Sequence, residues 1–407
     1  MRLHLARLGF ASVLQVAVIV SFGGTARSQS SFRDYSLFGA RGVYLQGANV
    51  RGGIVGSNND VNVGSFSSFN ALAGGGELIA QGPTVSGNVT FNGNVSLGGA
   101  TVGGAINSGK DVTVTAFGNT HGITAGGDVT FNGSSNAGNV TAGNNFTLGS
   151  FVTFNGDAAA NNNVFLNGST IRGNLTYGNS LYMGPFGGSI TGTQAVAPVV
   201  ARPSTFTPVG LPPAIAFTSG GANLTTGGTQ ANPLAPGSYG DLRLGSFQDL
   251  YLGPGNYYFT SIEILNSQAI HFLGLTAANS INIFVTGNIT EGALSSTTVN
   301  GLAFGSADPT LARNVFIETL GNFTQNSLGG DQIFGTIFAP NGDITFGQYS
   351  SVTGSVLAGG RVISSVGFTE NFQPSAVPEP PALVMTAVGL ILAAASTLRR
   401  RAASTGR

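Results

Sequence analysis

Few side chains in this sequence could do acid–base chemistry, and their spacing predicts no shared site. Of the three histidines, His4 lies in the predicted N-terminal signal peptide, while His121 and His271 are far apart and lack the HExxH spacing that sets two metal ligands on one helix face. The serines form no GxSxG nucleophile elbow. Cysteine is absent, which excludes thiolate metal sites, disulfides and cysteine nucleophiles. We therefore predict no catalytic residue, no metal site and no cofactor.

Carboxylates are the remaining candidates, because elongated β-folds can host carbohydrate-cleaving enzymes that use paired carboxyl groups. Asp331 and Asp343 stand twelve residues apart, and Asp241 and Asp249 stand eight apart, so neighbouring coils of a repeat fold could bring such pairs together. An Asp at the start of a strand more often satisfies a backbone N–H of a turn. The interpretation we favour is a protein that is not an enzyme, with a carbohydrate-active enzyme as the least favoured alternative.

Threonines recur at the outward positions of short β-like repeats. On a flat stacked face their hydroxyls would lie about 4.8 Å apart, one strand spacing, which suits a regular polysaccharide surface or ice. The alternative is that Thr is simply a good outward residue of a strand. The repeat register also breaks several times, which disfavours a lattice-matching surface. The candidate binding face comprises Thr90, Thr130, Thr147, Thr153 and Thr176.

The elements that must position these side chains are short and repetitive. Between residues 81 and 184 the sequence steps through units such as NVTFNG, DVTFNG, FVTFNG and NLTYGN, each about six residues long and ending in a Gly or Asn corner. Alternation puts two apolar residues of each unit on one face and the hydroxyl residue on the other. The residues predicted to point inward are Val89, Phe91, Val129, Phe131, Val152, Phe154 and Leu175.

A longer period overlies the six-residue step. The units that begin at Asp128, Phe151 and Asn174 are 23 residues apart, which suggests three short sides and a loop in each turn. Short strands that return at a fixed period are typical of a β-solenoid, in which each coil covers the apolar face of the next. A Gly/Asn-rich linker would lack the paired apolar positions. A β-sandwich would need longer strands. We predict an all-β fold, a parallel β-helix.

Composition supports this fold and excludes some functions. Charged residues make up 8% and Gly contributes 64 of 407 residues. Gly and Asn provide tight corners, and Val, Ile, Thr and Phe favour strands. Arginines gather at the two ends, and Lys110 is the one lysine. Because phosphate neutralisation needs a basic patch, we predict no nucleic-acid partner.

The repeat lapses where prolines gather, between residues 188 and 237, since Pro cannot serve a central ladder. Strand-like runs resume afterwards, as in INIFV, NVFIE and GTIFAPNGDITF. Whether the two β-rich regions form one continuous solenoid stays open at this level. The expected organisation is a signal peptide (1–28), a β-solenoid segment (33–187), a Pro/Gly-rich linker or loop excursion (188–237), a second solenoid segment (238–373) and a C-terminal tail (374–407).

Both ends carry targeting features. Arg2 and Arg7 precede an apolar run, and Ala26-Arg27-Ser28 provides the small residues that a signal peptidase accepts, so we predict an N-terminal signal helix and export. Residues 382–398 are apolar and are followed by the stop-transfer residues Arg399, Arg400 and Arg401, which predicts a C-terminal transmembrane helix.

A short motif precedes this apolar run, namely Val377, Pro378, Glu379 and Pro380. The order of Pro-Glu-Pro, apolar helix and basic terminus resembles the PEP-CTERM sorting signal over about the last thirty residues. The resemblance implies processing by an exosortase, a membrane protease-transpeptidase of Gram-negative bacteria that make exopolysaccharide. It also implies a location in the cell envelope, at the outer surface or in the extracellular matrix. A plain membrane anchor is the alternative.

Other phrases carry a second resemblance. PGNYYF, INIFVTGNI, GTIFAPNGDITF and VTGSVLAGG resemble choice-of-anchor A and bactofilin-like surface domains, and the stretch from NVFIETLGNFTQN to VLAGG is similar to secreted ice-binding-like β-helices. These families imply a parallel β-helix. We therefore expect an exported structural or adhesive component of the envelope or exopolysaccharide matrix that can self-associate and contact exopolysaccharide. The alternative is a β-helix module that binds polysaccharide or ice.

Overall fold

The computed structural model describes residues 31–374 except 116–117, 134, 294 and 327–328. The expected signal peptide and sorting tail, with Val377–Pro380 and Arg399–Arg401, lie outside the described residues. Within the described ranges, no helix is long and apolar enough to span a membrane. The helical elements are three 3-10 turns: η1 (Phe32–Asp34), η2 (Phe304–Ser306) and η3 (Pro309–Asn314).

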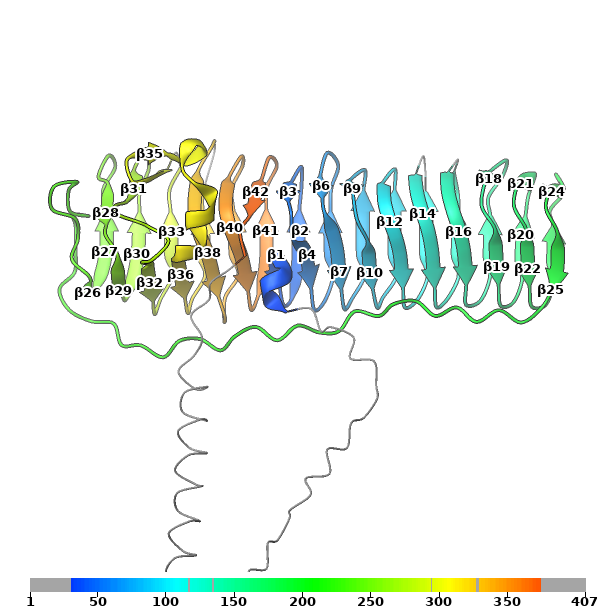
Figure 1. Cartoon of the computed structure of the whole chain (residues 1–407), viewed down its shortest axis with the longest axis horizontal. Helices are drawn as coiled ribbons and strands as arrows, with labels where there is room; N and C mark the ends of the chain where they lie inside the picture. The colour runs from blue at the N-terminus through cyan, green and yellow to red at the C-terminus, as the bar shows by residue number, and fades with distance from the viewer. Residues whose placement is uncertain (1–30, 116–117, 134, 294, 327–328, 375–407) are drawn as a thin grey trace, which may run out of the picture.

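The described chain is one long β-solenoid (Figure 1). Its strands pair in parallel with those of the coils above and below, apart from one antiparallel pair, β34 with β35. Each regular coil has three sides, because the strands β4, β5 and β6 of one coil pair with β7, β8 and β9 of the next. We name these side 1, side 2 and side 3. The predicted all-β parallel β-helix is confirmed.

The N-terminal half of the solenoid contains β1 to β25. Side 1 comprises β1 (Tyr35–Gly39), β4 (Ile54–Ser57), β7 (Ala71–Gly74), β10 (Val89–Phe91), β12 (Thr101–Ser108), β14 (Gly118–Ala125), β16 (Ser135–Ala142), β19 (Ala158–Ala160), β22 (Leu175–Tyr177) and β25 (Gln194–Val196). Side 2 comprises β2 (Gly42–Leu45), β5 (Val61–Val63), β8 (Leu78–Gln81), β11 (Val95–Gly98), β13 (Val112–Thr115), β15 (Val129–Phe131), β17 (Phe146–Leu148), β20 (Val164–Leu166) and β23 (Leu181–Met183). Side 3 comprises β3 (Asn49–Arg51), β6 (Ser68–Phe69), β9 (Thr84–Val85), β18 (Thr153–Phe154), β21 (Ser169–Ile171), β24 (Gly188–Ile190) and the starts of β12, β14 and β16.

The C-terminal half contains β26 to β42. Side 1 comprises β26 (Gly237–Ser238), β29 (Gly255–Phe259), β32 (Ile281–Val285), β36 (Val315–Thr319), β38 (Gln332–Ala339) and β40 (Ser351–Ala358). Side 2 comprises β27 (Asp241–Leu244), β30 (Ser261–Ile264), β33 (Ile289–Glu291), β37 (Phe323–Gln325), β39 (Ile344–Phe346) and β41 (Arg361–Ser364). Side 3 comprises β28 (Leu250–Leu252), β31 (Ala269–Phe272), β34 (Ser296–Val299), β35 (Leu302–Ala303) and β42 (Thr369–Phe372).

The two halves form one continuous stack, although the chain does not run through it from end to end. The first strand, β1, pairs with β4 on one side and with β40 on the other. In the same way β2 pairs with β41, and β3 pairs with β42. The chain therefore starts in the middle of the rod, winds to one end, crosses to the other end and winds back to the middle, as the colours in Figure 1 show.

The coil length differs from the 23-residue period. In the N-terminal half Val89 pairs with Ile106, and Asp128 donates its backbone N–H to Asp111, both 17 residues apart along the chain. The units at 128, 151 and 174 lie on three different sides, in β15, at β18 and in β22. A 23-residue spacing is thus one coil plus one six-residue side, which returns a similar unit but not the same side.

The predicted inward columns are confirmed. Val89, Phe91, Val129, Phe131, Val152, Phe154 and Leu175 are all buried in one continuous core. Phe131 packs against Phe146 and Phe154, with ring centroids 6.0 and 5.8 Å away. These rings come from side 2 strands of neighbouring coils and from side 3. Aromatic contacts between sides therefore fill the interior.

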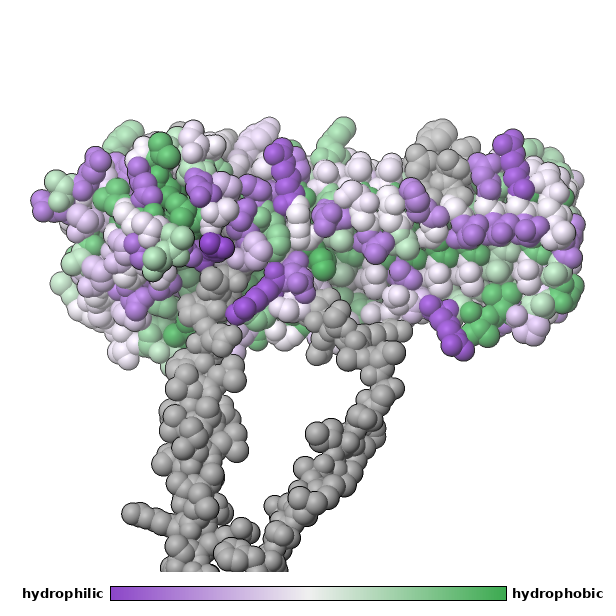
Figure 2. All heavy atoms as spheres, in the orientation of Figure 1, coloured by the Kyte–Doolittle hydropathy of each residue, from purple (hydrophilic) through white to green (hydrophobic). Residues whose placement is uncertain are grey.

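Asn and Asp side chains hold the corners of successive coils together. Asp111 Oδ1 accepts the backbone N–H of Asp128, and Asp128 Oδ1 accepts that of Asn145. A second corner repeats the arrangement from Asp157 to Asn174 and from Asn174 to Thr193. Figure 2 shows a row of hydrophilic residues along the N-terminal half of the rod. The sequence predicted a local role within the turn for Asp at strand starts, whereas these bonds join each corner to the same corner of the next coil, 17 to 19 residues on.

The proline-rich region has two structural parts. Strands β24 and β25 still pair with β21 and β22, so the solenoid continues to Val196 rather than ending near 188. Residues 197–219, the return segment, then run along the rod in extended form (Figure 1). Proline suits this course, because an extended segment outside the ladder does not need every N–H.

Side chains on the coils fix the return segment in place. Asn92 donates to the carbonyl of Phe206 and accepts its N–H, both at 2.8 Å. Asn58 binds the backbone of Val209 in the same two-way manner. Phe206 and Val209 join a buried apolar cluster on the outside of side 1, which also contains Tyr35, Phe38, Phe284, Phe316, Phe338 and Leu357. The return segment thus covers an apolar stripe.

Candidate functional site

The candidate threonines do not form one face. Thr130 and Thr147 are partners on side 2, and Thr113 precedes them in the same column. Thr90 and Thr176 lie on side 1, where their pairing partners include Ala73 and Ala159 rather than other threonines. Thr153 lies on side 3 and pairs with Thr170. Because a coil has three sides, residues that look equivalent in the sequence face different directions.

Side 2 carries a long outward column of mixed chemistry. Two runs of hydroxyl residues belong to it, Thr290-Thr324-Thr345 and Ser96-Thr113-Thr130-Thr147. Between these runs stand Ile363, Tyr44, Asn62 and Ile79. The interruption means that no uniform threonine array runs the length of side 2.

Toward one end of the rod the column becomes aromatic. Phe165 follows Thr147 and stacks on Tyr182, with ring centroids 5.0 Å apart and an interplanar angle of 8°. Phe151 and Phe186 form a second exposed pair, 5.5 Å between centroids. Met183 and Val196 are also exposed there. The last coil thus displays several apolar side chains.

This end of the rod is open. Strands β23, β24 and β25 each pair with a single strand among the described residues, namely β20, β21 and β22. Each therefore presents a row of backbone N–H and C=O groups on its outer edge, and such edges can pair with another chain. We call the exposed coil formed by residues 181–196 the open end.

The opposite end is covered by residues 220–236, which we call the end cap. Leu224 and Leu234 form parallel bridges with Leu242 and Leu252 of the first C-terminal coil, and both leucines pack on the core. Leu224 donates its N–H to Asp241 and accepts that of Arg243, both at 2.8 Å. The two ends of one rod therefore differ in what they offer a partner.

One histidine belongs to a polar chain that spacing in the sequence does not reveal. His271 Nδ1 lies 2.7 Å from Thr298 Oγ1, and its Nε2 lies 3.2 Å from Asp249 Oδ2. Tyr251 stacks on the imidazole at 4.2 Å. Positions 251, 271 and 298 are in register on side 3 of successive coils. A chain of hydrogen bonds in the order Asp249, His271, Thr298 could relay a proton. The same bonds also give each of the three side chains a hydrogen-bond partner, as a purely structural arrangement would.

The carboxylate pairs considered from the sequence do not converge. Asp343 accepts the N–H of Arg361 and forms an ion pair with its guanidinium at 3.1 Å. Asp331 is buried and accepts the N–H of Ser295. Asp241 binds the Ser261 hydroxyl. In the described ranges, no group of three or more His, Cys, Asp and Glu residues could hold a metal ion.

Three buried carboxyl groups lie at separate places in the C-terminal half. Burial raises the pKa of Glu291 to about 8, and the negative charge of Asp331 adds to the shift. Burial also raises the pKa of Glu318 to about 7, against the opposing effect of the hydrogen bond from Ile215 N–H. The pKa of Glu370 is raised well above its ordinary value by burial. All three side chains are buried, Glu318 beneath the return segment, so none of them lines an accessible groove.

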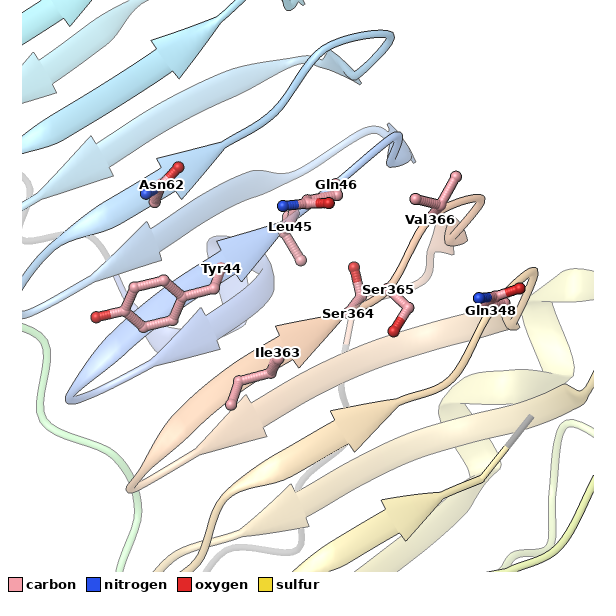
Figure 3. A pocket seen from close by; sticks show the side chains of 9 residues that line it. All are labelled: Tyr44, Leu45, Gln46, Asn62, Gln348, Ile363, Ser364, Ser365 and Val366. Carbon is pink, nitrogen blue, oxygen red and sulfur yellow. The ribbon is translucent and has the colours of Figure 1, made fainter. Parts of the chain in front are cut away.

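Two clefts are candidates for binding. One, of about 800 Å³, lies between side 1 and the return segment, and Thr90, Asn107 and Phe206 are among its lining residues. The other, of about 450 Å³, lies on side 2 where β41 meets β2 (Figure 3). Both volumes fall in the range of about 300–1,000 Å³ that is usual for small-molecule sites.

Comparisons with known proteins find a family match to part of the chain and a solved structure of low similarity. No curated protein matches the chain. A crystal structure of an ice binding protein from an Antarctic bacterium Flavobacteriaceae is similar at 15% sequence identity, covering 84% of this chain and 98% of that chain, with a TM-score of 0.26. Residues 77–176, in the coils leading to the open end, match the family described as "Bactofilin: Polymer-forming cytoskeletal".

Proposed function

We propose that this protein is an exported structural component of a bacterial envelope or extracellular matrix, and that two rods associate through their open ends. The observation that carries the proposal is the contrast between the open end, with three singly paired strands, and the capped end. The match of residues 77–176 to a polymer-forming family supports self-association.

The apolar side chains at the open end strengthen this argument. Met183 and Val196 are exposed on its edge strands, and Leu181 and Ile190 are half-buried against the core. A second copy would cover these side chains and also pair the free backbone groups. Since both contributions are lost in a monomer, association at this surface is favoured.

The geometry predicts a closed pair rather than a fibre. A contact between two identical surfaces is isologous and closes after two copies, whereas a filament needs two different complementary surfaces. The end cap occupies the surface that a filament would require. Longer assemblies would therefore form only if the cap were displaced.

Mass measurement in solution tests the pairing. The full chain should elute as a dimer in size-exclusion chromatography with light scattering, and electron micrographs should show rods of twice the monomer length. Met183→Lys with Val196→Lys should give monomers, because lysine blunts an edge strand. Ile79→Lys introduces the same kind of charge on the middle of side 2, away from the open end, and should leave the dimer intact. A wild-type chain that stays monomeric at all concentrations would refute the pairing.

The export and sorting steps are a separate part of the proposal. Export is supported by the N-terminal apolar run, and sorting is supported by the order of Val377–Pro380, residues 382–398 and Arg399–Arg401. An exosortase-type enzyme would cleave the tail, and the mature rod would remain with the exopolysaccharide. Intact-mass analysis of protein from the native envelope tests this step: a species that still ends at Arg407 would mean that the tail serves only as an anchor. Glu379→Ala should leave an unprocessed, membrane-retained form.

A further inference from the structure

The cleft on side 2 is built jointly by the first and last coils of the chain. Tyr44, Leu45, Gln46 and Asn62 come from the N-terminal half, whereas Gln348 and residues 363–366 come from the C-terminal half (Figure 3). Pairing of β2 with β41, from Gly42 opposite Arg361 to Leu45 opposite Ser364, brings the two sets together. The cleft therefore exists only when the solenoid is closed at its seam.

Tyr44 provides a flat aromatic surface at one side of this cleft. A side chain at Gly42 would meet the Tyr44 ring at 2.8 Å, so the ring lies over Gly42 on the surface of β2. Figure 3 shows the Tyr44 ring lying along strand β2. The residue is 36% exposed. One ring face is thus turned to the backbone, and the other can receive a ligand.

Polar side chains with unused hydrogen-bonding capacity line the rest of the cleft, from Asn62 to Gln348 at the side away from Tyr44 (Figure 3). Within the described part of the chain, the side chains of Gln46, Asn62, Gln348 and Ser365 make no hydrogen bond to protein. Ser364 also borders the cleft, but its side chain belongs to the inward column of β41, because its strand partners Leu45 and Phe346 are buried in the core and its own hydroxyl is buried as well. The groups that a ligand can reach are therefore the three amides and the Ser365 hydroxyl, together with the Tyr44 ring.

The chemistry of the lining selects the ligand. Three amides and the Ser365 hydroxyl can each donate and accept, as the hydroxyls of a sugar require. The Tyr44 ring supplies the apolar platform against which the C–H face of a sugar can pack. None of the described residues that line the cleft carries a charge. This absence disfavours phosphorylated or uronic ligands, since charges that are partly desolvated need partners.

We propose that this seam cleft binds a segment of a neutral saccharide. Tyr44 stacks on one sugar ring, Asn62 and Gln46 bind hydroxyls close to it, and Ser365 and Gln348 bind hydroxyls of the adjoining part of the segment. The inference does not rest on association through the open end, because the seam lies in the middle of the rod (Figure 1).

The test begins with an array of neutral and uronate-containing oligosaccharides, followed by calorimetric titration of the best neutral probe onto the full chain. Tyr44→Ala should weaken binding about tenfold or more, equivalent to about 1.4 kcal/mol. Tyr44→Trp should retain binding because it retains the platform. Asn62→Ala should weaken binding less, because it removes one hydrogen-bonding side chain and keeps the platform.

Matched controls keep the result interpretable. Ile79→Ala removes an exposed apolar residue from the same side 2 column, one coil beyond Asn62 and outside the cleft, and should not change binding. Circular dichroism and the melting temperature of each variant report whether the fold is retained. The proposal is overturned if no neutral saccharide binds, if acidic saccharides bind better, or if Tyr44→Ala and Ile79→Ala bind equally well.

Discussion

The two halves of this solenoid solve the same packing problem in different ways. In the N-terminal half the coils are close to 17 residues long, and the interior is filled by aliphatic and aromatic side chains. In the C-terminal half the repeat varies from 18 residues between Asp343 and Arg361 to 34 residues between Asn288 and Asn322. Buried Glu291, Glu318 and Glu370 also lie there. The comparison teaches that parallel pairing tolerates long insertions, because loop closure costs little extra free energy as a loop lengthens.

The two halves also differ in whether the aromatic side chains on their outer surface are covered. Aromatic residues on the outside of side 1 in the C-terminal half, such as Phe284, Phe316 and Phe338, are buried beneath the return segment. At the N-terminal half's far end, Phe151, Phe186 and Tyr182 remain exposed. A segment that links the two ends of the rod therefore protects one half and leaves the last coil of the other available for contacts.

The largest expected effect is in the aromatic interior of the N-terminal half. Phe131→Ala should lower the free energy of unfolding by about 3–5 kcal/mol, because it removes a buried ring and leaves a cavity between Phe146 and Phe154. Thermal or denaturant unfolding measures the change. Phe165→Ala, which removes an outward ring, should cost far less. Equal losses for the two variants would contradict the inward assignment.

The buried carboxyls predict that the C-terminal half becomes less stable as the pH rises. The folded state keeps Glu291 protonated up to about pH 8, whereas the unfolded chain releases this proton near 4.5. The unfolded state thus binds fewer protons between these values, and stability falls as pH rises from 4.5 to 8, by about 1.4 kcal/mol per unit of raised pKa. Melting temperatures at pH 5 and pH 8 check this sign.

Glu291→Gln supplies the matched variant for that measurement. The amide keeps the shape of the carboxyl and does not titrate, so the fall in melting temperature between pH 5 and pH 8 should become smaller. Glu263→Gln, on the outer surface of the neighbouring strand and ion-paired with Arg243, serves as the control. A wild-type chain whose melting temperature rises over this range would contradict the assignment.

The attachment of the return segment should give a smaller, local effect. Asn58→Ala with Asn92→Ala removes two-way hydrogen bonds to Val209 and Phe206, each hydrogen bond contributing about 1 kcal/mol. Backbone amides of residues 204–210 should exchange faster with deuterium, while those of β15 and β17 keep their protection. Unchanged exchange at 204–210 would mean that apolar packing alone holds the segment.

The smallest effect is expected on the outward threonines of side 2. Thr130→Val should change the free energy of unfolding by no more than about 0.5 kcal/mol, since the residue is partly exposed and its hydroxyl makes no hydrogen bond within the described part of the chain. Chemical denaturation measures this value. A loss comparable to that of Phe131→Ala would show that the hydroxyl column is a structural element in its own right.

The sequence by itself determined the local features of this protein. Alternation of Val with Phe or Leu sets which side chains point inward, because successive residues of a strand face opposite ways. Gly and Asn mark the corners, and Asp at strand starts provides the hydrogen bonds that hold them. Alternation and corner residues depend on neighbouring residues only, so the all-β solenoid and the seven inward residues from Val89 to Leu175 could be predicted from the printed residues, whereas the coils that the Asp hydrogen bonds join could not.

Only the tertiary structure decided which coil lies beside which. Within each half, parallel pairing joins residues 16 to 34 positions apart, and similar units on different sides gave the misleading 23-residue period. The pairing of β1 with β40, the seam cleft around Tyr44 and the chain from Asp249 through His271 to Thr298 all join distant segments. Almost any alternating strand can pair with almost any other in parallel, so the order of the coils is selected by the packing of the whole core and by the return segment that closes the rod.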